Sequence, residues 1–550
     1  MVPLGDKDRG RAVRICCAGV ALRIGLALSG LQPTLASAME LVVSSTSWER
    51  AQEGYFLGTL GLSHYAGGVF SGSPLMLAAV AFCAMLPAAV QTLAAAILFA
   101  GVDLASALLL RAMCVRAVAV ESCDWETQLE DWMDEDLKPP TVSGRASSRS
   151  PFPGSPNTEG NAPKSSLVAG DTKGQAPDGR GDMASHGNGS PTRDDGAAWN
   201  LPDIVLAVYF LNPVIAGQCA ALSGDVLGRV LPLAALVAAG SGRPGVTAAA
   251  LAAAACLWRF HAAPLILPAA LMLGTNSCGA GGGGTQENGL NGEGRGPTPG
   301  VSLSSSEVAG GAAEAGSGAL YDPRYFELDG KALLRLSVGF LVWCAAILGA
   351  CWAATSRSWA FLGAAAKGQL LCENLTPNIG LYWYFFAELF PRFRGFFRVL
   401  FLSQPYVYVL PATLRLGMFP EALASLLLAI FGLFQPYPTM ADPILAGCLF
   451  LCHPRTSARM RLVIPVGMVA LVPSLLLPTM RHLWLQAGTG NANFYYFQTV
   501  ALNVLLAVFV LQFAAALVKR RKALAVAFER RRKAGAGEAE AGAAANERER

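Results

Sequence analysis

Long apolar runs without a charged residue are the feature that most constrains the fold. Four of them cover residues 336–356, 422–441, 462–480 and 482–518. The hydrocarbon core of a bilayer is about 30 Å thick, roughly 20 apolar residues span it as a helix, and backbone groups in lipid must be hydrogen-bonded internally. Only 15% of the 550 residues are charged. The sequence therefore predicts an all-α, polytopic transmembrane helical bundle, and a soluble protein with a very large helical core is the less favoured alternative.

The apolar pattern predicts about twelve spans, several of which are short or interrupted by proline. They are expected near 12–31, 92–114, 201–217, 225–240, 245–260, 262–274, 331–353, 395–415, 420–438, 441–453, 460–480 and 494–518.

The placement of basic residues predicts the orientation of these spans. Segment 519–533 directly follows an apolar run and holds eight basic residues and one acid. Cytosolic loops of membrane proteins carry an excess of Lys and Arg. If the chain starts in the cytosol and alternates, this segment, Arg111, Arg415 and Arg455 all fall on the cytosolic side, and so do both termini. The same alternation sends three segments to the lumen, namely the first loop at 32–73, about 354–394 and 481–493.

Two low-complexity segments divide the chain. Residues 139–198 are rich in Ser, Gly, Pro and Asp, and residues 275–319 are rich in Gly. Such compositions bury too little apolar surface to offset the entropy of ordering, so both are predicted to be disordered cytosolic linkers. The expected organisation is first transmembrane helices (1–120), an acidic helix and linker (121–200), further transmembrane helices (201–274), a Gly-rich linker (275–330), the main bundle (331–518) and a basic cytosolic tail (519–550).

The first loop contains Trp48-Glu49-Arg50, Gly61, Tyr65, Gly67-Gly68 and Ser73-Pro74. With these residues it resembles the first loop of GT-C glycosyltransferases, which use lipid-linked sugars. It implies a GT-C-like bundle and keeps open an alternative function, a mannosyltransferase with a polyprenyl-phosphate sugar donor. Such enzymes place acidic residues, often an Asp pair, in this loop, where a carboxylate acts as a base or binds a metal. Here the loop has no Asp, and its acids are Glu40, Glu49 and Glu53. We therefore expect no catalytic residue, metal or cofactor.

Three further segments carry a more specific resemblance. They read NLTPNIGLYWYFFAELF (374–390), FQPYPTMAD (434–442) and HLWLQAGTGNANFYYFQTVALN (482–503). Together with YFLNP (209–213), they resemble the phosphatidylinositol-glycan class U (PIG-U) subunit of the glycosylphosphatidylinositol (GPI) transamidase. The resemblance covers 200–260, weakly the first loop, and strongly 331–518.

This resemblance implies a place in an endoplasmic reticulum complex that attaches GPI anchors to proteins. It implies that a separate, cysteine-protease-like subunit performs the chemistry. The subunit that this chain resembles is expected to help hold the GPI lipid or the C-terminal attachment signal of the proprotein. No nucleic-acid partner is implied.

The residues expected to hold a ligand lie in two of these segments. Aromatic side chains at a membrane interface can cover apolar ligand surface, and neighbouring amides and a carboxylate can bond an ethanolamine or sugar group. The alternatives are an ordinary interfacial aromatic girdle for the first segment and helix capping for the amides of the second. The candidates are Asn378, Tyr382, Trp383, Phe385, Phe386, Glu388, Asn491, Asn493, Phe494 and Tyr495.

Two aspartates lie inside apolar runs, where a charge is costly and therefore a functional candidate. Asp225 precedes Arg229 by four residues, so a helical ion pair is expected. Asp103 has no neighbour in sequence to pair with. Such residues, with proline-broken helices, keep a transporter open as a third alternative. Glycosylation of the sequon at Asn374 is not expected, because Pro377 follows it and its surroundings are apolar.

Overall fold

The structure, a computed structural model, describes residues 6–121, 200–279, 328–355 and 357–548, with single residues at 129, 130, 133 and 138. The regular elements in these ranges are helices, which confirms the all-α prediction. The α-helices are α1 (Asp6–Leu28), α2 (Gln32–Ala36), α3 (Trp48–Thr59), α4 (Pro74–Ala84), α5 (Ala88–Glu121), α7 (Leu201–Phe210), α8 (Pro213–Ala220), α9 (Gly224–Gly240), α10 (Pro244–Leu257), α11 (Ile266–Gly279), α12 (Gly330–Ala354), α13 (Ala360–Gln369), α14 (Tyr382–Glu388), α15 (Pro391–Val407), α16 (Val409–Leu416), α17 (Pro420–Phe434), α18 (Ala441–Leu451), α19 (Pro454–Ser457), α20 (Val463–Leu485) and α21 (Ala492–Arg548). Three short 3-10 helices are η1 (Ser44–Thr46), η2 (Ala66–Gly68) and η5 (Phe260–Leu265).

Each expected span overlaps one helix or two consecutive helices. Four helices in the described ranges are long and apolar enough to cross a membrane, namely α5, α12, α20 and the part of α21 up to Gly537. Helices α7 and α8 together pass the same test, with a bend of 47° between them. Asn212 makes this break, because its side chain caps α8 by accepting a hydrogen bond from the Val214 amide. The shorter apolar helices remain predicted spans.

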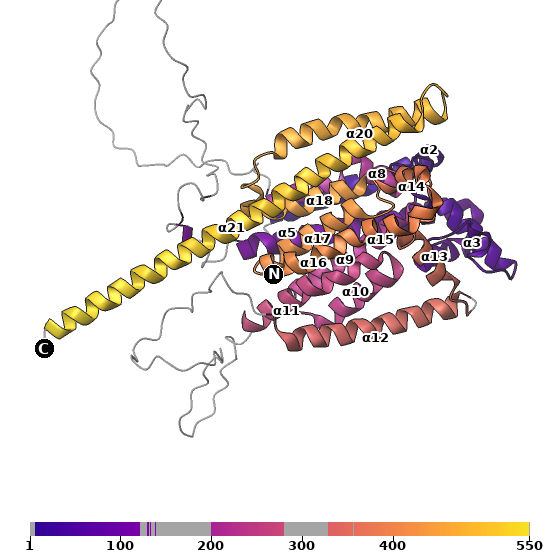
Figure 1. Cartoon of the computed structure of the whole chain (residues 1–550). Helices are drawn as coiled ribbons and strands as arrows, with labels where there is room; N and C mark the ends of the chain where they lie inside the picture. The colour runs from indigo at the N-terminus through magenta and orange to yellow at the C-terminus, as the bar shows by residue number, and fades with distance from the viewer. Residues whose placement is uncertain are drawn as a thin grey trace, which may run out of the picture. The chain divides into compact units, whose positions relative to one another are not determined.

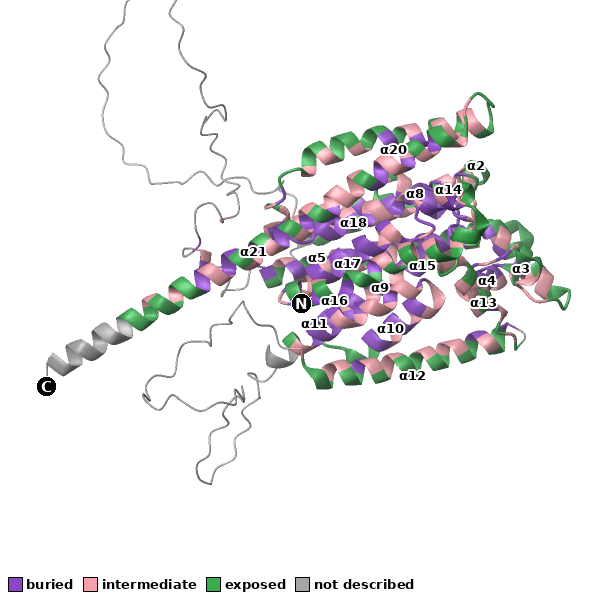
Figure 2. Cartoon of the chain, in the orientation of Figure 1, coloured by how far each residue is buried: buried purple, intermediate pink, exposed green. Residues whose placement is uncertain are grey.

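Helices α12 and α20 form two outer faces of the helical unit (Figures 1 and 2). Only 11% of the apolar window of each is buried. α12 packs along α10, and α20 packs along α21. Between them the main core gathers buried residues from α5, α7, α9, α17 and α18. Exposed apolar helix faces of this kind are expected where lipid is the solvent.

One expected boundary differs in the structure, and one helix was not expected. α11 continues to Gly279, five residues into the segment expected to be disordered, and the rest of both linkers lies outside the described residues. α4 was not expected as a helix. Of the acidic segment 121–136, Leu129 and Met133 are buried against the main core, and most of the remainder lies outside the described residues.

Several basic residues that the alternating topology assigns to the cytosolic side lie together at one end of the bundle. The guanidinium of Arg520 lies 2.6 Å from the Glu121 carboxylate, which also accepts a hydrogen bond from the Arg455 amide at 2.8 Å. Arg521 donates to the carbonyl of Arg415 at 2.8 Å. α14 lies at the opposite end (Figure 1). The grouping agrees with the predicted topology, although the compartment on each side stays a prediction.

The two aspartates inside apolar runs are paired, but not as the sequence suggested. Asp103 on α5 bonds Arg23 of α1 at 2.6 Å and accepts a hydrogen bond from the Tyr209 hydroxyl at 3.0 Å. Asp225 pairs with Arg259 at 2.6 Å. The expected pair of Asp225 with Arg229 is therefore wrong. Arg229 instead donates to the Tyr209 hydroxyl and to the side chain of Gln218, because the fold turns it toward α7 and α8.

Candidate functional site

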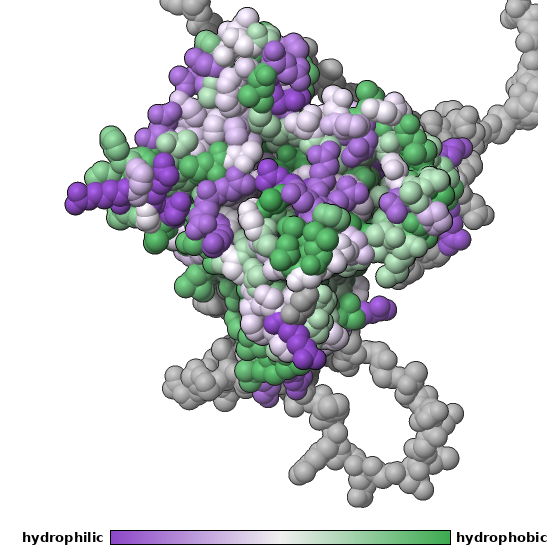
Figure 3. Space-filling view, turned by 90° about the vertical axis from the view of Figure 1, so that its right-hand side faces the viewer, coloured by the Kyte–Doolittle hydropathy of each residue, from purple (hydrophilic) through white to green (hydrophobic). Residues whose placement is uncertain are grey.

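The two motif segments that carry the ligand-binding candidates meet at one end of the bundle. The Tyr496 hydroxyl donates to the Leu381 carbonyl at 2.9 Å, and the Asn503 amide donates to the Ile379 carbonyl at 2.8 Å. The Tyr384 hydroxyl also donates to the side chain of Asn493. Segments about 100 residues apart in sequence thus form one unit, at the right-hand end of Figure 1, and Figure 3 shows that end with hydrophilic residues beside apolar patches.

Four of the candidate aromatic residues lie inside this unit rather than on its surface. Tyr382, Trp383, Phe386 and Tyr495 are each at most 5% exposed. The Trp383 ring stacks on Trp484 at 6.4 Å between ring centroids. Such pairs add specific geometry to apolar burial. These side chains hold the two segments together, and a ligand at this end would meet other residues first.

Asn378 is also committed to the protein. It is 1% exposed, its side-chain oxygen accepts the Gly380 amide at 2.7 Å, and its side-chain nitrogen donates to the Thr376 carbonyl at 3.1 Å. These bonds shape the loop that leads into α14. An added Cβ at Gly380 would come within 2.8 Å of Pro438, so the loop requires glycine at this close approach.

The remaining candidates are open to the surroundings. Glu388, Asn491, Asn493 and Phe494 are exposed, and Phe385 is half-buried. The side-chain oxygen of Asn491 accepts the Asn493 amide at 3.0 Å and the Phe494 amide at 3.3 Å, so it caps α21 as the alternative interpretation expected. Glu388, Asn493 and Phe494 are the candidates at this end with a free face.

The three acids of the first loop differ in burial and in partners. Glu40 is 6% exposed and bonds Arg481 at 3.2 Å, while its backbone carbonyl accepts the Met440 amide at 2.9 Å. Burial raises the pKa of Glu40, although Arg481 opposes that shift. Glu49 and Glu53 are exposed on α3. Glu40 thus fastens the loop to α20 and to the segment before α18.

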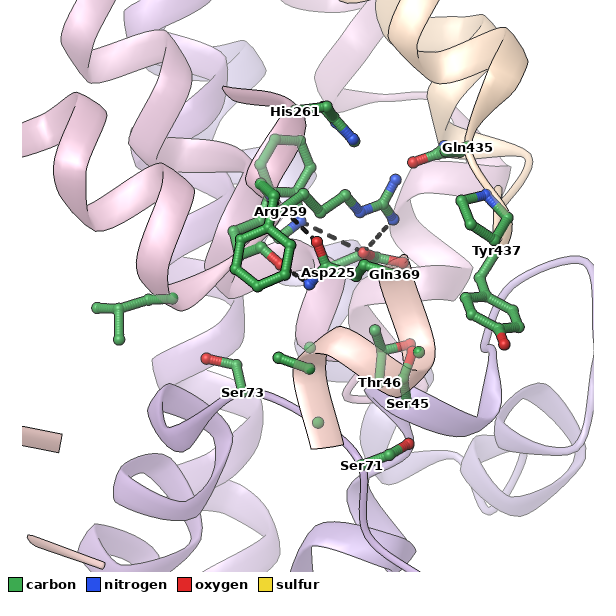
Figure 4. Close-up of a pocket in the computed structure, with 18 of the residues that line it drawn as sticks. Ser45, Thr46, Ser71, Ser73, Asp225, Arg259, His261, Gln369, Gln435 and Tyr437 are labelled. Atoms are coloured by element: carbon green, nitrogen blue, oxygen red, sulfur yellow. Dashed lines mark hydrogen bonds and ion pairs between the residues drawn. The ribbon is translucent and has the colours of Figure 1, made fainter. Parts of the chain in front are cut away.

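A cavity that sequence reasoning missed lies beneath this loop (Figure 4). It contains about 1220 Å³ of empty space, its open mouth included, and is lined by parts of η1, α4, α9, α13, α15, α17 and the residues around η5. Segment 434–442 contributes Gln435 and Tyr437 to its wall. Two features of the sequence could have indicated this cavity. One is Arg259, which is a charge within an apolar segment, and the other is the motif at 434–442.

The polar end of the cavity is built around Arg259. Its guanidinium lies 2.6 Å from Asp225 and 3.8 Å from Asp442. Gln369 of α13 clamps the chain beside it, because its side chain donates to the Trp258 carbonyl at 3.0 Å and accepts the Phe260 amide at 2.9 Å. Figure 4 shows Asp225, Arg259 and Gln369 together, with Gln435 turned toward them.

Comparison with known proteins places the chain in a family. The family model described as GPI transamidase subunit PIG-U matches residues 17–502. The chain belongs to the PIG-U family. That range contains the PIG-U-like motif segments almost to their last residue and every residue that lines the cavity.

Curated relatives support the PIG-U assignment over a shorter stretch. The GPI-anchor transamidase component PIGU of Mus musculus is 37% identical over 147 residues, which are 27% of this chain and 34% of the relative. The GPI transamidase component GAB1 homolog of Schizosaccharomyces pombe is 34% identical over 161 residues, covering 29% of this chain and 40% of the relative. GAB1 of Saccharomyces cerevisiae is 35% identical over 144 residues, covering 26% and 36%. The chain thus matches about a third of the length of these relatives.

Proposed function

We propose that this chain is a non-catalytic membrane subunit of a GPI transamidase in the endoplasmic reticulum, where it helps hold the GPI lipid or the C-terminal attachment signal. The observation that carries the proposal is the PIG-U family match over residues 17–502. The printed names of the relatives describe components of that transamidase. Its partners would be the other subunits, including a cysteine-protease-like subunit that performs the chemistry.

The surface around Asn493 is the proposed contact for the lipid or the signal. Phe494 is 56% exposed and offers an apolar face, while Glu388 and Asn493 offer a carboxylate and an amide beside it. Both ligands have a hydrophobic tail joined to a polar group, and a membrane interface is where aromatic and polar side chains meet such molecules.

The mannosyltransferase alternative is less favoured. It requires acids of the first loop to converge on a donor, whereas Glu40 is tied to Arg481, and Glu49 and Glu53 face outward on α3. None of the three lines the cavity. We therefore propose that a separate subunit performs the catalysis.

The proposed topology puts both termini and both linkers in the cytosol and α14 at the lumenal end. The test uses a membrane-impermeant thiol reagent and cells whose plasma membrane is permeabilised while the endoplasmic reticulum stays sealed. The reagent should modify a cysteine introduced at Ala543 in these cells. It should modify one introduced at Glu388 only after the reticulum membrane is also opened. The reverse pattern would contradict the topology and the lumenal assignment of the Asn493 surface.

The function itself is tested with exposed residues, so that folding is spared. The double variant Asn493→Ala with Phe494→Ala should lower GPI attachment, with accumulation of free GPI and unprocessed precursor, while the other subunits still co-purify. Losing the apolar contact of one ring is worth up to roughly 1.5–3 kcal/mol, about tenfold or more in affinity. Phe82→Ala is the matched control, because Phe82 is 54% exposed on α4. Normal anchoring in the double variant would refute the assigned surface.

A further inference from the structure

The cavity beneath the first loop contains polar groups that the protein leaves unsatisfied. Gln435 is 4% exposed, and neither its side-chain oxygen nor its side-chain nitrogen has a hydrogen-bond partner. Asp225 is 2% exposed, and its second carboxylate oxygen, Oδ2, also has none. Both residues line the cavity. Buried polar groups are normally bonded, so three open groups at one place indicate an occupant that bonds them.

The charges around these groups indicate which headgroup fits. Arg259 would attract a phosphate, but its guanidinium already faces Asp225 at 2.6 Å and Asp442 at 3.8 Å. An added anion would therefore meet two carboxylates and no spare positive charge on Arg259. The open groups are two acceptors, Asp225 Oδ2 and Gln435 Oε1, and one donor, Gln435 Nε2. Hydroxyl groups both donate and accept, so neighbouring hydroxyls match this set.

The rest of the wall indicates a hydrocarbon tail. Phe361, Leu402, Phe431 and Phe434 also line the cavity. They come from α13, α15 and α17, two of which coincide with predicted spans. Apolar walls with a few placed polar groups are typical of a ligand site, and the open mouth of the cavity leaves room for a chain to extend out of it.

We propose that this cavity binds an amphiphile with an uncharged, hydroxyl-rich headgroup, as in a glycolipid. Its hydroxyls donate to Asp225 Oδ2 and Gln435 Oε1 and accept from Gln435 Nε2, and its chain lies along Phe361, Leu402 and Phe434. The site is separate from the Asn493 surface and does not rest on the proposed function. A GPI glycan and the sugar of another glycolipid share this chemistry.

The test is photo-crosslinking of the full-length chain in phosphatidylcholine nanodiscs. The probe is dodecyl glucoside with a diazirine in its alkyl chain. Label is expected on peptides containing Phe361, Leu402 or Phe434, and excess dodecyl maltoside should displace it at least tenfold better than dodecyl phosphate. Equal competition by the phosphate would overturn the headgroup assignment, and label spread evenly over the lipid-facing helices would overturn the site.

Two variants separate ligand binding from folding. Gln435→Leu should reduce specific labelling at least tenfold, yet keep a melting temperature no lower than that of the unmodified chain, because it replaces an unsatisfied buried amide by an apolar group. Gln91→Leu is the matched control, since Gln91 lines no described part of the cavity. Leu402→Trp fills the space proposed for the hydrocarbon tail and leaves the polar end intact. If Gln435→Leu fails to fold, labelling of Leu402→Trp is measured in its place and should be reduced. Unchanged labelling in a folded variant would overturn the proposal.

The source of the ligand is identified by mass spectrometry of lipids that co-purify from cells. A hydroxyl-rich glycolipid should be retained by the unmodified chain and depleted at least tenfold from Gln435→Leu. A GPI-type species and another glycolipid would be distinguished by mass, and either supports the site. Depletion of phospholipids alone would overturn it. Because this assay does not measure anchoring, its failure leaves the proposed transamidase role standing.

Discussion

Removing the carboxylate of Asp103 should destabilise the bundle more than any change of an exposed acid. Asp103 is fully buried and faces Arg23, which is 1% exposed. The Arg23 side chain reaches the carboxylate through two nitrogens, at 2.6 and 2.7 Å, and the Tyr209 hydroxyl adds a third contact at 3.0 Å. Asp103→Ala would leave a buried guanidinium without its counter-ion.

The size of the effect follows from that geometry. Breaking a buried ion pair by removing one partner costs about 3–5 kcal/mol, whereas replacing both partners by apolar groups of similar volume is often neutral or stabilising. Arg23 keeps its bonds to the carbonyls of Gly19 at 3.0 Å and Phe210 at 2.7 Å, which places the expected loss near the lower limit. Arg23→Met with Asp103→Leu should therefore recover most of the stability lost in Asp103→Ala.

The assay is denaturant unfolding in lipid nanodiscs, followed by tryptophan fluorescence, of Asp103→Ala and of a double-mutant cycle that consists of the unmodified chain, Arg23→Met, Asp103→Leu and the double variant. A coupling free energy above about 2 kcal/mol is expected for groups in direct contact. Glu53→Ala on the exposed face of α3 is the control and should change stability by less than about 0.5 kcal/mol. The reasoning is refuted if Asp103→Ala stays within 1 kcal/mol of the unmodified chain, or if the double variant is as unstable as the single one.

Three further outcomes are expected. Trp383→Ala should lower the melting temperature by the equivalent of about 3–5 kcal/mol, because the ring is buried, and lost anchoring at unchanged stability would instead indicate direct ligand contact. Because burial raises the pKa of Glu40, the folded state binds more protons than the unfolded state. The free energy of unfolding should therefore fall as pH rises from the ordinary carboxyl pKa to the raised value. Unfolding measured across pH should show no such dependence in Glu40→Gln. Endoglycosidase should leave the gel mobility of the chain unchanged, because the Asn374 side chain already donates to Ser44 at 2.6 Å, and a shift that Asn374→Gln abolishes would disprove this.

Helices were predictable from the sequence because the lipid phase imposes a length on them. The run expected at 331–353 is α12, Gly330–Ala354, and the run expected at 225–240 is α9, Gly224–Gly240. Neither needed tertiary information, since internal backbone bonding in lipid requires a helix wherever the apolar run is long enough. The break at Asn212-Pro213 was visible as well, because proline at the first helical turn marks a new start.

Pairing and exposure were not predictable, because they depend on contacts between distant segments. Asp103 bonds a residue 80 positions away. The aromatic run of α14 has the same composition whether its rings face a ligand or each other, and only its packing against Trp484 and Tyr495 places Trp383 inside. The cavity is lined by residues of η1, α9, α13, α15 and α17, so no single segment of the sequence predicts it.

The buried hydrogen bonds form a chain through the bundle that apolar contacts alone would not specify. Arg23 bonds Asp103, which accepts from Tyr209, and Tyr209 accepts from Arg229. In lipid, apolar helix faces gain little by leaving the solvent, since acyl chains solvate them as well as other helices do. A sliding helix would lose few apolar contacts, but it would leave a buried charge without a partner, which is far more costly.

That chain ends at the cavity, which explains how the bundle can position a wall made of so many segments. Arg229 also donates to Gln218, and the Gln218 side-chain nitrogen donates to the Thr439 hydroxyl at 3.0 Å. The Thr439 amide donates in turn to Asp442 at 2.8 Å, and Asp442 lies 3.8 Å from Arg259. Register fixed at the centre of the bundle is thus transmitted to segment 434–442, which carries Gln435. Breaking the hydrogen bond between Arg229 and Gln218 would therefore move the Gln435 side chain relative to Arg259, although Arg229 does not line the cavity. The polar end of the cavity thus depends on hydrogen bonds that no bound ligand would contact.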